Sequence, residues 1–188
     1  MEAFLISTGV VALAEIGDKT QLLALVLAAK YRKPVPIILG ILVATLLNHA
    51  LAGAIGAWLA SVIGPEAMRW ILGVSFIAMA VWILVPDKVD DGETAASPRH
   101  GVFLATLVAF FLLEMGDKTQ IATVALAAQY ASLWAVVAGT TLGMMIANVP
   151  AVLLGEVAAT KLPMRLVHGV AAALFLLLGV LVLAGVGG

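Results

Sequence analysis

The sequence contains no cysteine, which excludes disulfide bonds, thiolate metal ligands and a cysteine nucleophile. Charged residues are also scarce: they make up 11% of the 188 residues, against about 25% in a typical soluble domain. The formal net charge is −1, so no strong field of one sign is available to attract nucleic acid. Hydrophobic residues reach 63%, compared with about 45–50% in soluble domains. This composition predicts an all-α integral membrane protein that lies in a lipid bilayer.

Long apolar segments alternate along the chain with short clusters of charged residues, glycine and proline. A helix needs about 20 residues to cross the hydrocarbon core, and each segment is long enough. In lipid these segments must be helical, because every backbone amide has to be satisfied internally. The first segment is expected to be a retained helix rather than a signal peptide, since its start is not basic. The pattern predicts six transmembrane helices, near residues 3–29, 35–61, 66–86, 101–129, 133–158 and 163–186.

Basic residues in the connections predict how the protein is oriented. The connections after the first, third and fifth predicted helices contain almost all the loop lysines and arginines, whereas the opposite side has only Arg69. Basic loops are retained on the cytoplasmic side of a membrane. We therefore expect both termini outside the cell, and the acidic linker 87–100 in the cytoplasm.

One seven-residue motif occurs twice. Glu15-Ile-Gly-Asp-Lys-Thr-Gln21 recurs as Glu114-Met-Gly-Asp-Lys-Thr-Gln120, at an offset of 99 residues. We interpret the chain as a duplication in which the linker joins a first repeat, residues 1–86, to a second repeat, residues 101–188. Because each repeat has three predicted helices, the second must be inverted relative to the first. Inverted repeats are typical of secondary transporters, whose binding site lies near the membrane midplane between the repeats.

The motifs place ionisable residues inside apolar segments, where each charge costs about 2.5–3.5 kcal/mol on insertion scales. Four carboxylates are the candidate metal ligands: Glu15, Asp18, Glu114 and Asp117. Together with the two motif lysines they carry a charge that balances one divalent cation. Oxygen ligands favour Mg²⁺, Ca²⁺ or Mn²⁺ over copper or zinc. Burial and mutual repulsion favour protons replacing the metal when it leaves, which offers a route to metal/proton exchange.

The remaining motif residues are candidates for supporting or gating roles. On a continuous helix, Lys19 would lie beside Glu15 at the i, i+4 spacing. The motif glycines lack a side chain, so they allow a helix break that would expose carbonyl oxygens as further ligands. These candidates are Gly17, Lys19, Thr20, Gln21, Gly116, Lys118, Thr119 and Gln120. The alternative interpretation is that Glu15–Lys19 and Glu114–Lys118 are buried ion pairs that only lock helices together.

Isolated polar residues within the other predicted helices are weaker candidates. Asn48, His49 and Asn148 would line the transport pathway, or would make ordinary interhelical hydrogen bonds. His49 aligns with Asn148 at the repeat offset. His168 and Arg69 also align, and we expect both to anchor at lipid headgroups near helix starts.

The doubled E-x-G-D-K-T motif, the three-helix repeats and the acidic central loop resemble one family over essentially the whole chain. It comprises small cation exchangers, including the bacterial MneA-type manganese exporters and the Golgi cation/proton exchangers. The resemblance implies that the four motif carboxylates bind the ion. It also implies export of Mn²⁺ from the cytoplasm, with Ca²⁺ as the competing substrate, by proton antiport through the bacterial cell membrane. No cofactor and no enzymatic activity are implied.

Two other functions use the same residues differently. A passive divalent-cation channel would employ the carboxylates as a selectivity ring. An intramembrane aspartyl protease would employ Asp18 and Asp117 as a catalytic dyad. The protease interpretation is the weaker, because each aspartate is followed by a lysine that opposes proton sharing. The sequence makes no prediction about oligomeric state.

Overall fold

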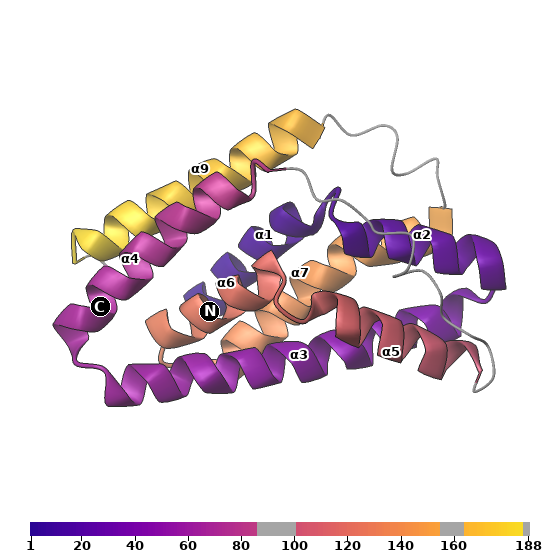
Figure 1. The fold of residues 1–188 in the computed structure, drawn as a ribbon, viewed down its shortest axis with the longest axis horizontal. Coiled ribbons are helices and arrows are strands. Elements are labelled where there is room, and N and C mark those ends of the chain that lie inside the picture. The colour runs from indigo at the N-terminus through magenta and orange to yellow at the C-terminus, as the bar shows by residue number, and fades with distance from the viewer. Residues whose placement is uncertain (86–100, 155–163, 186–188) are drawn as a thin grey trace.

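The computed structural model describes residues 1–85, 101–154 and 164–185 (Figure 1). Within these residues the regular structure is entirely helical, as the composition predicts. The linker 87–100 and the predicted end of the fifth helix after Leu154 lie outside the described residues. The helices are α1 (Glu2–Glu15), α2 (Lys19–Tyr31), α3 (Pro34–Val62), α4 (Pro65–Trp82), α5 (Val102–Glu114), α6 (Lys118–Gln129), α7 (Leu133–Leu154) and α9 (Met164–Leu183).

Both apolar segments that carry a motif are broken into two helices inside the motif. α1 gives way to α2, and α5 to α6, across three residues in each case. Gly17 and Gly116 have φ values of 86° and 79°, a conformation that glycine adopts without steric cost. The next residues, Asp18 and Asp117, cap the following helix. The single helices predicted over 3–29 and 101–129 are therefore wrong, and the break that the glycines allow is present in both.

Three of the described helices are long and apolar enough to cross a membrane. They are α3, α7 and residues Arg165–Leu183 of α9. Many large apolar side chains on these helices point outward, including Trp58 at 61% exposed and Trp134 at 77% exposed. Such exposure is unfavourable in water and is normal against lipid tails. The helices thus agree with a membrane location.

Two helix pairs, each of which joins the first half of the chain to the second, pack in the same way (Figure 1). α1 lies against α7, and α5 lies against α3. A Cβ at Gly139 would lie 2.5 Å from the Phe4 carbonyl oxygen, and a Cβ at Gly40 would lie 2.9 Å from the Phe103 carbonyl oxygen. Each glycine therefore allows close contact between backbones. The two contacts are related by the 99-residue offset, with the partners exchanged.

α4 and α9 lie side by side and form a further pair (Figure 1). The rings of Phe76 and Phe175 meet between them with centroids 6.3 Å apart. This α4–α9 pair packs mainly against α1 and α6, and these four helices supply most of one apolar cluster. A second apolar cluster consists of side chains from α2, α3, α5 and α7. The motif breaks therefore occur where the chain passes from one cluster to the other.

Candidate functional site

Three carboxylates converge where the two broken helices meet. Glu15, Glu114 and Asp117 each offer one oxygen, and these three oxygens lie within 4.8 Å of one another. Both glutamates are fully buried, and Asp117 is 4% exposed. Glu15 ends α1, Glu114 ends α5, and Asp117 caps α6, so both motifs contribute. Buried carboxylates at this spacing repel one another unless a cation or protons lie between them.

Each glutamate has one oxygen with a hydrogen bond and one without. The Thr20 hydroxyl donates to Glu15 Oε2 at 2.6 Å, and the Thr119 hydroxyl donates to Glu114 Oε2 at 3.3 Å. In the described part of the chain, the Oε1 atoms of Glu15 and Glu114 have no hydrogen-bond partner. A buried carboxylate oxygen without a partner carries a large desolvation cost. A bound divalent cation would compensate for this cost at both glutamates.

The fourth predicted ligand, Asp18, is outside this group of three. Its carboxylate accepts a hydrogen bond from the Thr20 backbone N–H at 3.3 Å, as a helix cap. Asp117 makes the equivalent contact to the Thr119 backbone N–H at 3.4 Å, and it also belongs to the group. The structure therefore brings together three of the four predicted ligands.

The motif lysine of the first repeat pairs with the second repeat. Lys19 Nζ lies 3.3 Å from Asp117 Oδ1, and Lys19 is 20% exposed. The sequence placed Lys19 beside Glu15 on a continuous helix; this is wrong, because the break at Gly17 turns α2 away from the axis of α1. The ion pair connects the two motifs and adds one positive charge beside the carboxylates. Lys118 Nζ donates to the Val85 carbonyl at 3.0 Å, after the end of α4.

The motif glutamines stabilise both breaks in the same way. Gln21 Oε1 accepts from the Gly17 N–H at 3.0 Å, and Gln120 Oε1 accepts from the Gly116 N–H at 2.7 Å. Gln21 Nε2 also donates to the Ala147 carbonyl of α7 at 3.0 Å. Each glutamine thus satisfies the backbone N–H of the positive-φ glycine in its own motif.

Asn48 of α3 connects to the second break. Its Nδ2 donates to the Phe111 carbonyl of α5 at 3.0 Å, and its Oδ1 lies 3.5 Å from Gln120 Nε2. Asn48 is fully buried. Of its two predicted roles, the interhelical hydrogen bond is therefore observed.

The aligned residues His49 and Asn148 are both fully buried. In the described part of the chain, neither ring nitrogen of His49 has a hydrogen-bond partner. Asn148 Nδ2 donates to the Met144 carbonyl at 3.1 Å, one turn earlier in α7. This bond is within one helix and not between helices. Neither residue belongs to the group of three carboxylates.

One contact at the first break was missed by the sequence analysis. His168 Nε2 of α9 lies 3.0 Å from the Ile16 carbonyl oxygen, so the expected headgroup anchor is wrong for His168. Because a carbonyl only accepts hydrogen bonds, Nε2 must carry the proton. The two residues are 152 positions apart, and no local pattern indicates that they meet.

Comparison with known proteins identifies the family. Residues 3–91 and 102–186 match the family described as "Divalent cation/proton antiporter GDT1", and this match includes both motifs. The chain belongs to the GDT1 family. The resemblance inferred from the doubled motif is thereby confirmed. This GDT1 protein is a membrane transporter of divalent cations and not an enzyme, so the protease interpretation is wrong.

Curated relatives match along nearly the whole chain. The "Putative manganese exporter" of Vibrio cholerae serotype O1 is 56% identical over 179 residues, covering 95% of this chain and 88% of the relative. "GDT1-like protein sll0615" of Synechocystis is 30% identical over 199 residues, covering 96% of each. "GDT1-like protein 3" of Oryza sativa subsp. indica is 25% identical over 200 residues, covering 93% of this chain and 71% of the relative. No solved structure matches this chain.

Proposed function

We propose that this GDT1 protein exports Mn²⁺ from the cytoplasm in exchange for protons, with Ca²⁺ as the competing substrate. It acts in the bacterial cell membrane as six transmembrane segments in two inverted repeats, residues 1–86 and 101–188. Both termini face outward, and the linker 87–100 is cytoplasmic. The name of the Vibrio cholerae relative supports manganese as the substrate, and the family description supports proton antiport.

The observation that carries the proposal is the group formed by Glu15, Glu114 and Asp117, whose oxygens lie within 4.8 Å of one another. With Lys19 paired to Asp117, the ionised group has two more negative than positive charges, which matches one divalent cation. The ligands are hard oxygens, and Mn²⁺ and Ca²⁺ both accept such ligands. Among the described residues the Oε1 atoms of the two glutamates have no hydrogen-bond partner, so both are available to coordinate a cation.

Packing supports the inverted arrangement. The Gly139–Phe4 contact has its counterpart in the Gly40–Phe103 contact, with the two repeats exchanged. Phe76 and Phe175 correspond at the repeat offset and meet each other. Both kinds of contact are expected if a pseudo-twofold axis relates the repeats. The axis gives each contact between the repeats a counterpart in which the two repeats are exchanged. Equivalent residues that lie next to the axis, such as Phe76 and Phe175, contact each other. Two repeats that each contain an odd number of membrane spans, and that are related by such an axis, have opposite orientations in the membrane.

Proton coupling follows from the same three carboxylates. When the cation leaves, three buried carboxylates beside one ammonium repel one another, and protonation removes this repulsion. When the cation returns, it displaces these protons. Export and proton entry are then alternative occupancies of one site, which is the physical basis of antiport.

Reconstituted proteoliposomes provide the test. An imposed pH gradient should drive Mn²⁺ to a concentration above equilibrium, and collapse of the gradient should abolish this accumulation. A passive channel would only equilibrate Mn²⁺, and this result would contradict antiport. Glu15→Gln and Glu114→Gln preserve side-chain size and should abolish transport. Glu66→Gln is the control, because Glu66 is exposed at the start of α4 and outside the group of three.

A further inference from the structure

The peptide unit between Ile16 and Gly17 is bonded to side chains at both of its polar ends. His168 Nε2 of α9 donates to the Ile16 carbonyl oxygen at 3.0 Å, and Gln21 Oε1 of α2 accepts from the Gly17 N–H at 3.0 Å. Glycine adopts positive and negative φ about equally, so the local backbone alone does not keep this peptide plane in one orientation. The two side-chain hydrogen bonds therefore fix a plane that the glycine leaves free to turn.

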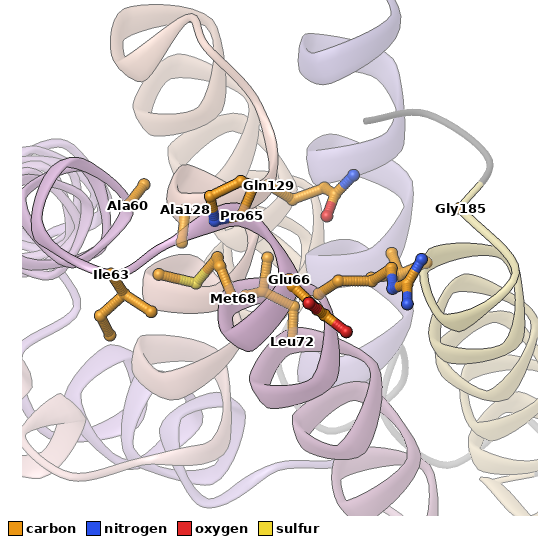
Figure 2. A pocket seen from close by; sticks show the side chains of 11 residues that line it. Ala60, Ile63, Pro65, Glu66, Met68, Leu72, Ala128, Gln129 and Gly185 are labelled. Carbon is orange, nitrogen blue, oxygen red and sulfur yellow. The ribbon is translucent and has the colours of Figure 1, made fainter.

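The equivalent peptide unit in the second motif keeps the glutamine contact, because the Gly116 N–H donates to Gln120 Oε1 at 2.7 Å. The counterpart of His168 at the repeat offset is Arg69, which lines an open cleft of about 710 Å³. Gln129, at the end of α6, lines the same cleft (Figure 2). The second break lies at the start of α6, a helix of 12 residues that is about 18 Å long. Arg69 is therefore too far from the second break to take the place of His168.

The two breaks also differ in the hydrogen bond that crosses them. Across the first break, the Thr20 hydroxyl lies 2.6 Å from Glu15 Oε2. Across the second break, the Thr119 hydroxyl lies 3.3 Å from Glu114 Oε2. Each bond joins the helix before the break to the helix after it, so its length depends on how these two helices are placed. The shorter bond occurs at the break that α9 contacts through His168.

We propose that His168 is a positioning residue for the Glu15 carboxylate. By fixing the Ile16–Gly17 peptide it fixes the angle between α1 and α2, and this angle keeps Glu15 within reach of the Thr20 hydroxyl and of the other two carboxylates. His168 does not bind the cation through Nε2, because this nitrogen carries the proton that it donates. The inference rests on the proposed transport function, since it treats Glu15 as a cation ligand.

Hydrogen exchange in the metal-free protein tests the contact without any cation. His168→Met removes the donor, whereas His168→Gln places an amide N–H donor near the position of Nε2. We expect the Gly17 amide to exchange about three- to tenfold faster in His168→Met than in the wild type, which is the factor that one neutral hydrogen bond contributes. His168→Gln should restore most of the protection. The Gly116 amide is the internal control, and its exchange should be the same in all three proteins.

Mn²⁺ uptake into proteoliposomes tests the consequence for the carboxylate site. His168→Met should raise the KM for Mn²⁺ about three- to tenfold and change kcat less, because the Glu15 carboxylate is displaced before the cation binds. His168→Gln should return KM to near the wild-type value. A role in packing alone predicts the opposite order, since methionine is the more apolar of the two side chains. Arg69→Met and Arg69→Gln are the matched control, and they should differ neither in KM nor in exchange of the Gly17 amide.

Three results would overturn the proposal. The first is equal exchange of the Gly17 amide in His168→Met and His168→Gln. The second is faster exchange in His168→Met with an unchanged KM, because the contact would then not position the ligand. The third is loss of proton-driven uptake in His168→Gln as well as in His168→Met, because His168 would then carry protons. Absence of Mn²⁺ uptake by the wild type would instead overturn the proposed function, while the exchange result still upholds or overturns the contact itself.

Discussion

The two motif threonines give a quantitative prediction, because duplicated residues make unequal bonds. The Thr20 hydroxyl lies 2.6 Å from Glu15 Oε2, within the range of about 2.5–2.7 Å for a hydroxyl donating to a carboxylate. The Thr119 hydroxyl lies 3.3 Å from Glu114 Oε2, beyond the usual limit of about 3.0 Å for a good O–H···O bond. Thr20 should therefore stabilise its glutamate much more strongly than Thr119 does.

A hydrogen bond to a charged group contributes about 1.5–3 kcal/mol. Since about 1.4 kcal/mol corresponds to tenfold in affinity, Thr20→Val should raise the KM for Mn²⁺ about 10- to 100-fold. The weak bond of Thr119 is worth about 0.5 kcal/mol, so Thr119→Val should raise KM about threefold or less. Initial rates of Mn²⁺ uptake into proteoliposomes, measured over a range of Mn²⁺ concentrations, give both values.

Serine at the same positions is the control for this prediction. Thr20→Ser keeps the hydroxyl and should restore most of the affinity that Thr20→Val loses. Thermal unfolding without metal should be measured for each variant, so that loss of stability is separated from loss of Mn²⁺ binding. Equal KM values for Thr20→Val and Thr119→Val would refute the reasoning, as would a serine variant that behaves like valine.

Two further predictions concern stability. Gly139→Ala places a Cβ 2.5 Å from the Phe4 carbonyl oxygen and should destabilise the protein by about 1–3 kcal/mol. In Gly9→Ala the new Cβ has no packing neighbour within 4 Å among the described residues, so this variant should be neutral or stabilising. Thermal unfolding in detergent compares the two variants. Lys19→Met leaves Asp117 without its 3.3 Å partner and should cost about 1–3 kcal/mol, less than the roughly 3–5 kcal/mol of a fully buried pair because Lys19 is 20% exposed. Added Mn²⁺ should raise the Tm of Lys19→Met more than that of the wild type, and an unchanged metal-free Tm would contradict the role of this pair.

The helical class and the position of the breaks could be predicted from the sequence because both have local causes. Apolar segments must be helical in lipid, whatever surrounds them. Gly17 and Gly116 adopt a positive-φ backbone conformation that is unfavourable for other residues, and the aspartates that follow them are good helix caps. Three of the four proposed ligands meet because the duplicated motif places carboxylates at both breaks.

The partners of individual side chains could not be predicted, because they depend on how the helices pack. Lys19 reaches Asp117 only after α2 turns away from α1, and the direction of that turn is set by packing against α7. His168 meets the Ile16 carbonyl across 152 positions of sequence. Spacing along one helix gives the neighbours of a residue only while that helix is continuous, and the motif breaks remove this condition at the candidate site.

Duplication supplies equivalent residues, but one shared site requires them to act differently. Asp117 offers an oxygen to the group of three and pairs with Lys19, whereas Asp18 is outside that group. If a pseudo-twofold axis relates the repeats, as proposed, the opposite assignment, with Asp18 in the group, is equally compatible with the motif sequence. The inequality of the two aspartates then comes from how the helices pack and not from the motif itself.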